Sequence, residues 1–447
     1  MHSSLSTAIK VVRALQARGH EALLAGGCVR DRLLRRRPQD YDVATSAHPG
    51  EVERIFPRTV AVGKAFGVIR VLVDDEEIEV ATFRSESGYV DGRRPGRVSF
   101  TDAREDALRR DFTVNGLFYD PLRRRILDYV GGRTDLRRQC LRAIGRPEER
   151  FGEDRLRLLR CVRFAAQLGF RIDPATWRAV CKEAPAIRRV SFERIRDELT
   201  KLLLAPHAAE GLRLLWRSGL LRHLLPEVDA MAGVRQPRAY HPEGDVWKHT
   251  RLVVAHLRKP SPRLAWAALL HDVGKPPMAE KSVARGRWRL RFPNHAGCGG
   301  EMADRILLRL RFSTADREAI VAMVKNHMTF KDCQAMRLAT LKRLLARPTF
   351  EEELRLHRAD CLASHGSESH VRYLRRRQKE LSAAGIRPPR LLNGRDLIEL
   401  GLQPGPVFGQ ILAAIEEAQL EGRVSTRGQA LDEARKQAAE RKMTLKK

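Results

Sequence analysis

Two aspartates one residue apart, Asp40 and Asp42, follow a short basic segment near the start of the chain. If they lie in a strand, their side chains share one face, because residues i and i+2 point the same way. Two carboxylates held side by side repel each other unless a cation lies between them, and Mg²⁺ binds in this way together with substrate phosphates. The pair therefore predicts a Mg²⁺ site, with the solvated start of a strand as the alternative.

A glycine turn and a third carboxylate accompany this pair. Gly26 and Gly27 end an apolar run and precede an expected helix that starts near Val29. Glycines let the backbone approach a phosphate closely, and a helix N-terminus offers free N–H donors. The run EIEVATF places Glu77 and Glu79 on one face of a second strand, and we expect Glu79 to be the third carboxylate. A second divalent ion would let such a site bracket attacking and leaving oxygens.

A carboxylate and a guanidinium further along the chain could read a nucleobase. Asp154 and Arg157 are three residues apart in FGEDRLRLLR, which predicts that they share a helix face, and Glu153 can orient Arg157. An acceptor beside fixed donors matches the amino donor and ring acceptor that cytosine and adenine share, and it opposes the reverse order in uracil and guanine. From the residues alone, an ordinary ion pair on a solvated helix is the simpler interpretation.

Histidines and aspartates recur in the second half of the chain, and one adjacent pair follows an apolar run that predicts a helix. An adjacent His-Asp pair in LLHDVGKP, with further His and Asp on other helices, suits a divalent metal. A lone histidine in a helix is more often structural, and the HDVGKP string favours the metal interpretation. The candidate ligands are His249, His271, Asp272, His295, His327 and Asp360.

The elements that must position these residues change along the chain. The first 140 residues mix helices with short runs rich in Val, Ile and Leu, and from about residue 141 Leu, Ala and Arg recur at helical spacing. The sequence predicts an α/β head with a small mixed sheet, followed by a mainly α-helical neck, body and tail. Segments with prolines and glycines interrupt the helices at 233–245 and 386–396. The expected domains are 1–140, 141–232, 233–385 and 386–447.

Composition limits the partners and the surroundings. Lys and Arg total 84 against 55 acidic residues, and the net charge of +29 predicts a polyanionic partner, nucleic acid first, unless the chain is merely arginine-rich. Seven cysteines without a CxxC pair indicate reduced thiols in a cytoplasmic protein. No apolar run approaches the ~18 residues of a membrane span, and the first twenty residues predict a helix rather than a signal peptide.

Together, the motifs of the first half resemble the nucleotidyltransferase signature of class II CCA-adding enzymes and bacterial poly(A) polymerases. The small departures are Gly116, where alanine is usual, and Cys28, which fills a variable position. The motifs are GGCVRD and DYDVAT, the flexible-loop region EVATFRSESGYVDGRRPGRVSF, the ribose and triphosphate motif RRDFTVNGL, the motif DYVGGRTDL, the base-reading FGEDRLRLLR and the last helical motif SFERIRDEL.

The resemblance implies a reaction and the residues that serve it. An RNA 3′-hydroxyl attacks the α-phosphate of CTP or ATP, which adds CCA to tRNA; neither DNA nor a membrane is an expected partner. The catalytic carboxylates would be Asp40, Asp42 and Glu79, of which the two aspartates hold Mg²⁺. The nucleotide-binding residues would be Gly26, Gly27, Arg30, Asp31, Arg110, Asp111, Asn115, Asp154, Arg157 and Arg160.

Two alternatives remain at this level, a poly(A) polymerase or A-adding enzyme and an inactive RNA-binding protein. The stretch VGKAFGVIRV, residues 62–71, resembles the CCA-adding variant, whereas poly(A) polymerases are more basic there. The loop YVDGRRPGRV is intact, which argues against an enzyme that adds only CC but leaves an A-adding one. Intact Asp40, Asp42, Asp154 and Arg157 oppose the inactive protein.

HDVGKP resembles the HD phosphohydrolase domain, which some CCA-adding enzymes carry. The resemblance implies phosphatase or 2′,3′-cyclic phosphodiesterase activity with a divalent metal of unspecified identity, and Lys275 near a phosphate. The alternative is a body that only binds RNA. His249, His271, Asp272 and Asp360 match the four ligand positions, and His295 and His327 match the extra ligands of two-metal members.

Overall fold

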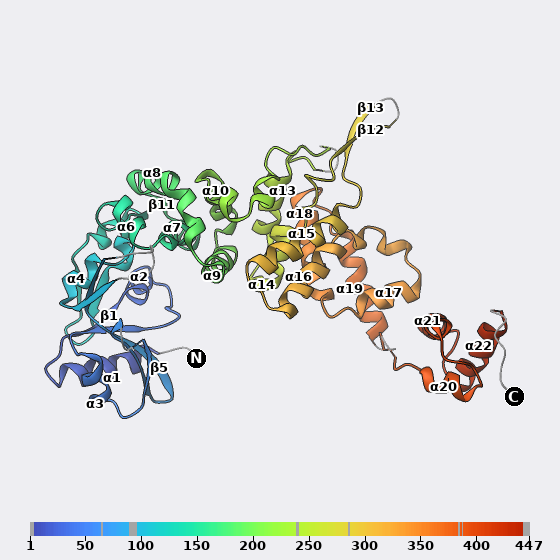
Figure 1. Cartoon of the computed structure of the whole chain (residues 1–447), viewed down its shortest axis with the longest axis horizontal. Coiled ribbons are helices and arrows are strands. Elements are labelled where there is room, and N and C mark those ends of the chain that lie inside the picture. Colours follow the sequence, from blue (N-terminus) through green and yellow to red (C-terminus); the bar gives the residue numbers. More distant parts are fainter. Residues whose placement is uncertain are drawn as a thin grey trace. The chain divides into compact units, whose positions relative to one another are not determined.

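The computed structural model describes residues 4–63, 66–88, 96–237, 241–284, 287–382, 385–386 and 388–440. The chain divides into two compact units (Figure 1). The first comprises Met1–Ala232 with Ile306–Phe312, and the second comprises Gly233–Arg305 with Ser313–Lys447. None of the described helices combines the length and hydropathy that a membrane crossing requires.

A seven-stranded mixed sheet forms the start of the first unit, in the order β3-β4-β5-β2-β1-β8-β9. Within this sheet only β2 and β5 pair in parallel, and the other neighbours are antiparallel. This confirms the predicted mixed sheet. The strands are β1 (Ala22–Ala25), β2 (Asp42–Thr45), β3 (Thr59–Gly63), β4 (Val68–Val73), β5 (Glu76–Thr82), β8 (Leu117–Asp120) and β9 (Arg125–Asp128).

Short helices and a ribbon surround this sheet. One core cluster packs Leu23 and Ala44 of the strands against Ala103 and Ala107 of a helix, with Phe83 and Phe118 in edge-to-face contact at 5.9 Å. The antiparallel ribbon joins β6 (Arg84–Ser87) to β7 (Arg97–Phe100). The helices are α1 (Leu5–Gln16), α2 (Gly27–Leu33), α3 (Pro49–Ile55), α4 (Ala103–Leu108) and α5 (Gly132–Arg137).

The rest of the first unit is helical, as the sequence predicts. Helix α7 (Leu156–Leu168) is buried along nearly its whole length and packs against α9 (Phe192–Leu203) and α10 (Ala208–Arg217). Its buried residues lie on all sides of the helix, so α7 is surrounded by protein. The remaining elements are α6 (Pro147–Glu153), α8 (Pro174–Glu183), α11 (Leu220–Leu224), α12 (Pro226–Asp229) and the short parallel pair β10 (Cys140–Leu141) and β11 (Arg171–Ile172).

The second unit is built around α14 (Pro262–Leu270), whose residues 264–270 are all buried. An antiparallel hairpin of β12 (Glu280–Ala284) and β13 (Arg287–Arg291) interrupts the helices, which the sequence analysis did not predict. The C-terminal helices pack on a core of their own. The helices are α13 (Val246–His256), α15 (His295–Arg309), α16 (Thr314–Asn326), α17 (Leu338–Leu345), α18 (Phe350–Ala363), α19 (Ser369–Ser382), α20 (Gly394–Glu399), α21 (Pro406–Leu420) and α22 (Arg427–Glu440).

Candidate active sites

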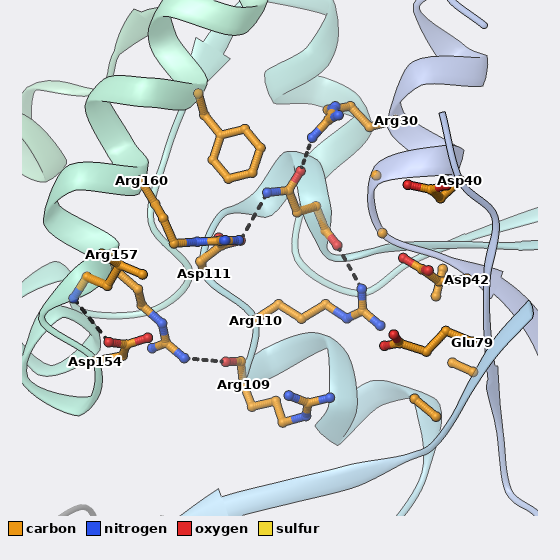
Figure 2. Close-up of a pocket in the computed structure, with 18 of the residues that line it drawn as sticks. Arg30, Asp40, Asp42, Glu79, Arg109, Arg110, Asp111, Asp154, Arg157 and Arg160 are labelled. Carbon is orange, nitrogen blue, oxygen red and sulfur yellow. Dashed lines mark hydrogen bonds and ion pairs between the residues drawn. The ribbon is translucent and has the colours of Figure 1, made fainter. Parts of the chain in front are cut away.

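A cavity of about 670 Å³ in the first unit gathers the predicted head residues (Figure 2). Twelve of the thirteen line it, and the exception, Asp31, forms an ion pair of 2.8 Å with Arg30, which does line it. The predicted residues that line the cavity are Gly26, Gly27, Arg30, Asp40, Asp42, Glu79, Arg110, Asp111, Asn115, Asp154, Arg157 and Arg160.

The sheet register places two of the carboxylates side by side. Asp42 begins β2 and lies directly opposite Glu79 on the parallel strand β5, so the two side chains share a face. Glu77 instead pairs with Arg70 at 3.5 Å and is not among the lining residues. Because β2 starts at Asp42, Asp40 precedes the strand, and the prediction that both aspartates lie within one strand is wrong. Asp40 nevertheless lines the same cavity.

The charges of this cluster suit a bound cation. Removal of water raises the pKa of Asp42 to about 6, and repulsion from Glu79 and Asp40 adds to the shift against the attraction of Arg110. A divalent ion would relieve that repulsion. The cluster is open: among the described residues, three ligand atoms lie within 4.8 Å of one another only in the second unit. It therefore fits a hard ion whose remaining ligands come from substrate phosphates and water.

The glycine turn has a geometric reason. Gly26 adopts φ +72° and ψ −125°, a conformation that side-chain-bearing residues rarely take, and a Cβ there would lie 2.7 Å from Arg110 Nη1. Helix α2 starts at Gly27, two residues earlier than the predicted start near Val29. The turn thus lets the backbone and the Arg110 guanidinium occupy the same corner of the cavity.

A chain of buried polar groups fixes the other nucleotide-binding candidates. Arg30 Nη1 donates to Asn115 Oδ1 at 2.6 Å, and Asn115 Nδ2 donates to Asp111 Oδ1 at 3.0 Å (Figure 2). Arg160 donates twice to Asp111 Oδ2, at 2.9 and 2.6 Å. Burial alone would raise the pKa of Asp111, but Arg160 and Asn115 hold it at about 2. The carboxylate therefore stays ionised and the arginines stay oriented.

The predicted base-reading pair is built differently from the expectation. Helix α6 ends at Glu153, and Asp154 is extended at φ −138° and ψ 108° before α7 begins, so Asp154 and Arg157 do not share a helix face. Asp154 Oδ2 instead accepts from Arg194 Nη2 at 2.8 Å. Arg157 donates to Glu153 at 2.5 Å. It also donates to the Arg109 carbonyl at 3.1 Å (Figure 2). Asp154 and Arg157 are thus held by different hydrogen-bond partners, and both residues line the cavity.

Arg194 is a cavity residue that the sequence analysis missed. It lies in SFERIRDEL, which the resemblance singled out as a motif, but its partner is 40 residues away in sequence. Spacing cannot predict a contact between different helices at that separation. Part of the predicted flexible loop, residues 89–95, lies outside the described residues, as do residues 64–65 of VGKAFGVIRV.

The second unit brings all six predicted ligands together. They come from α13, the ends of α14 and α16, the start of α15, and α18. Asp360 Oδ1 lies 2.9 Å from His249 Nε2. The Nε2 atoms around the Asp272 carboxylate lie 3.3 Å (His271), 3.7 Å (His295), 3.7 Å (His327) and 3.9 Å (His249) from its oxygens.

The backbone orients three of these imidazoles. The Nδ1 atoms of His271, His295 and His327 lie 2.9, 2.9 and 2.6 Å from the carbonyl oxygens of residues three positions earlier. This arrangement turns each Nε2 toward Asp272. Burial lowers the pKa of His327 to about 3 and also lowers that of His295, so both candidate ligands are neutral. With His271 Nε2 buried and without a hydrogen-bond partner among the described residues, the donor set fits a divalent metal.

A segment that the sequence predicted only as a break, residues 233–245, contributes to this site. The Glu243 side chain is 3% exposed, and its Oε1 lies 2.6 Å from Nδ1 of His249, the candidate histidine whose ring has no backbone hydrogen bond among the described residues. The same oxygen lies 3.0 Å from His241 Nδ1. Gln236 and His241 line a cavity of about 450 Å³ together with Asp272 and Asp360. The glycines and prolines of residues 233–245 predicted only a break between helices, and only the fold could place the polar residues of this segment.

The mixed sheet and its carboxylates Asp42 and Glu79 define a nucleotidyltransferase head. The histidines and aspartates gathered around Asp272 define an HD domain that follows it in the chain. The family model for the Poly A polymerase head domain matches residues 22–142, the model described as "Probable RNA and SrmB- binding site of polymerase A" matches 169–231, and the HD domain model matches 240–364.

Similar proteins identify the family within this class to which the chain belongs. A CCA-adding enzyme of Streptococcus pneumoniae is 33% identical over 439 residues, 96% of this chain and 97% of that protein. One of Bacillus subtilis is 41% identical over 268 residues, 60% of this chain and 64% of that enzyme. The crystal structure of the Bacillus stearothermophilus CCA-adding enzyme in complex with CTP superposes with a TM-score of 0.77 at 28% identity, covering 99% of both chains. The chain belongs to the family of CCA-adding enzymes, which confirms the resemblance stated above.

Proposed function

We propose that this chain adds C, C and A in turn to the 3′ end of tRNA, with CTP and ATP as substrates. The observation that carries the proposal is one cavity that joins Asp42 and Glu79, in register, to Asp154 and Arg157. The related enzymes are named for CCA addition, so a poly(A) polymerase is not favoured. We expect the activity in the cytoplasm, where tRNA and nucleoside triphosphates meet.

The reaction is an in-line attack of the tRNA 3′-hydroxyl on the α-phosphate, with pyrophosphate leaving. Asp40 and Asp42, with Glu79 beside them, would hold a divalent ion, which we take to be Mg²⁺ and which would supply Lewis-acid stabilisation of the transferring phosphate. The Gly26 turn lets the triphosphate approach the backbone, and Arg110 offers its guanidinium at that corner. The chain's part is positioning and charge neutralisation.

Base choice is assigned to Asp154 and Arg157. The Asp154 carboxylate accepts from the amino group of cytosine or adenine, and the Arg157 guanidinium donates to the neighbouring ring nitrogen. Uracil and guanine present a carbonyl and a ring N–H in the reverse order. Their carbonyl oxygen would therefore face the Asp154 carboxylate, and two acceptors cannot form a hydrogen bond. Because Arg194 and Glu153 hold the two groups independently, the pattern is fixed before a nucleotide enters.

A single incorporation assay tests the proposal. The purified chain is incubated with Mg²⁺, tRNA that lacks its 3′ CCA, and each nucleotide alone or in combination. Two C residues followed by one A are expected. Long A tracts would instead identify a poly(A) polymerase, A added only to tRNA that already ends in CC would identify an A-adding enzyme, and RNA binding without incorporation would indicate an inactive relative.

We propose a second activity, metal-dependent phosphohydrolysis in the second unit, because four histidines surround the Asp272 carboxylate and Asp360 contacts one of them, His249. A divalent metal held there would activate water and polarise a phosphate. The test is hydrolysis of 2′,3′-cyclic CMP and of p-nitrophenyl phosphate with added divalent ions. We expect His271→Ala to abolish the hydrolysis, and hydrolysis at the wild-type rate by this variant would remove the site from consideration.

A further inference from the structure

Two buried side chains line the cavity of about 450 Å³ that Asp272 and Asp360 also line. Gln236 is 5% exposed and Lys275 is 6% exposed, and both line the cavity. Lys275 Nζ donates to Gln236 Oε1 at 2.6 Å and lies 2.7 Å from Asp272 Oδ2. Lys275 therefore connects Asp272, a candidate metal ligand, to Gln236, which precedes Asp272 by 36 residues in the sequence.

The contact with Lys275 fixes which way the Gln236 amide points. An ammonium group has three donors and no acceptor, so the amide oxygen, not the nitrogen, must face it. Gln236 Nε2 is thereby directed elsewhere, and it is buried with no hydrogen-bond partner among the described residues. A buried donor without a partner is costly, which indicates that something absent from the free chain accepts from it.

The charges around the cavity favour an anionic ligand beside Gln236 Nε2. Lys275 and Lys331 line it, and its two acidic residues, Asp272 and Asp360, are both assigned to the metal. Because Gln236 lines the cavity, its unpartnered Nε2 is available to a ligand bound there while Oε1 keeps its contact with Lys275. An anionic oxygen beside the metal cluster would accept from the amide and the ammonium together.

We propose that Gln236 and Lys275 form a subsite for a non-bridging oxygen of the substrate's phosphate. Gln236 has two roles there: its Oε1 positions the Lys275 ammonium, and its Nε2 donates to the phosphate. The ligand class is a phosphate monoester or a cyclic phosphodiester, since each presents at least two non-bridging oxygens. The inference rests on the proposed hydrolytic activity and names the residues that would hold its substrate.

A double-mutant cycle separates the donor role from mere support of the lysine. Gln236→Met, Lys275→Met and the double variant are made in the full chain, with Gln410→Met, an exposed position on α21, as the matched control. The Kd of inorganic phosphate for the Mn²⁺-loaded protein is measured by calorimetry, and Mn²⁺ content and melting temperature are recorded for each variant. The readout does not require turnover.

Gln236→Met is expected to weaken phosphate binding about 10- to 100-fold, and to weaken it again in the Lys275→Met background, because it removes a hydrogen bond to a charged group. An effect that disappears in the Lys275→Met background would mean that Gln236 only supports the lysine, and would overturn the donor role. An unchanged Kd in both backgrounds would overturn the subsite. The Gln410→Met control should bind phosphate like the wild type.

Kinetics distinguish this inference from the proposed hydrolysis. If the wild type cleaves p-nitrophenyl phosphate or 2′,3′-cyclic CMP, Gln236→Met should raise KM for either substrate more than it lowers kcat. If the wild type cleaves neither but binds phosphate in a Gln236-dependent manner, the hydrolytic proposal fails and the subsite stands. Hydrolysis with a wild-type KM in Gln236→Met would show that the reaction occurs without this contact.

Discussion

Individual carboxylates in the head are distinguished by small differences in position. Glu77 and Glu79 lie on the same strand two residues apart, yet only Glu79 is opposite Asp42 and lines the cavity, whereas Glu77 pairs with Arg70. Strand periodicity alone assigns both to one face. The parallel register, which no sequence pattern states, decides between them.

The pair supplies a matched experiment on the catalytic carboxylates. Asp42→Asn and Glu79→Gln should each reduce nucleotide incorporation by about 100-fold or more, because metal stabilisation of the transferring phosphate contributes several kcal/mol. Glu77→Gln should retain most activity. Incorporation of labelled CMP into tRNA is the measurement, and tRNA binding by the Asp42→Asn variant should be preserved. Equal losses in the Glu77 and Glu79 variants would contradict the assignment.

Glu243 is a residue whose effect should appear in metal binding. It contacts His249 at 2.6 Å, and supports of this kind typically change metal affinity 10- to 100-fold. We expect Glu243→Gln to weaken Mn²⁺ binding by about that factor, measured by titration of the metal-free protein. Glu301→Gln, an exposed position on α15, is the control. Unchanged affinity in the Glu243 variant would make the contact structural only.

At the level of elements, the turn between β1 and α2 combines strained backbone with close packing. Gly26→Ala should cost about 1–2 kcal/mol of folding stability through its left-handed φ and should displace Arg110, raising KM for CTP and ATP. Gly131→Ala shares a positive φ of 77° but has nothing within 4 Å of the added Cβ. It should lose stability without a change in KM. Urea unfolding and incorporation kinetics of both variants check the comparison.

The break between α6 and α7 makes Asp154 depend on a third helix. Arg194→Met should free the Asp154 carboxylate and reduce discrimination of CTP against UTP by about tenfold, the effect of one charge-assisted hydrogen bond. The measurement is misincorporation of UMP and GMP. Arg178→Met, exposed on α8, serves as the control. Undiminished selectivity in the Arg194 variant would place the control of base choice elsewhere.

The sequence predicted elements well where a local pattern was strong. The runs around β1, β4, β5 and β9 were identified from their Val, Ile and Leu content, and the helical remainder from its spacing. The β12–β13 hairpin was missed although β13, RWRLR, alternates charged and apolar residues, because that run is short and its partner β12, EKSVA, does not alternate. The shared helix face of Asp154 and Arg157 was wrongly predicted because nothing in FGEDRLRLLR marks the interruption. The roles of the site residues remain predictions.

For the whole molecule, two separate units carry two sets of candidate ligands. We expect Asp42→Asn to abolish incorporation while hydrolysis of 2′,3′-cyclic CMP continues, and Asp272→Asn to do the reverse. Both activities are measured on the same preparations. Loss of both activities in a variant that melts at the wild-type temperature would mean that the two sites depend on each other.

The position of Gln236 also bears on how the chain can be divided for study. The HD family model begins at residue 240, and a fragment cut there would keep every candidate metal ligand and Glu243. It would lose Gln236, the partner of Lys275, and Gly233, whose N–H donates to Asp245 at 2.7 Å. A fragment that begins at residue 240 is thus expected to bind metal but to bind phosphate weakly. An expression boundary chosen from homology alone would therefore misrepresent the second unit.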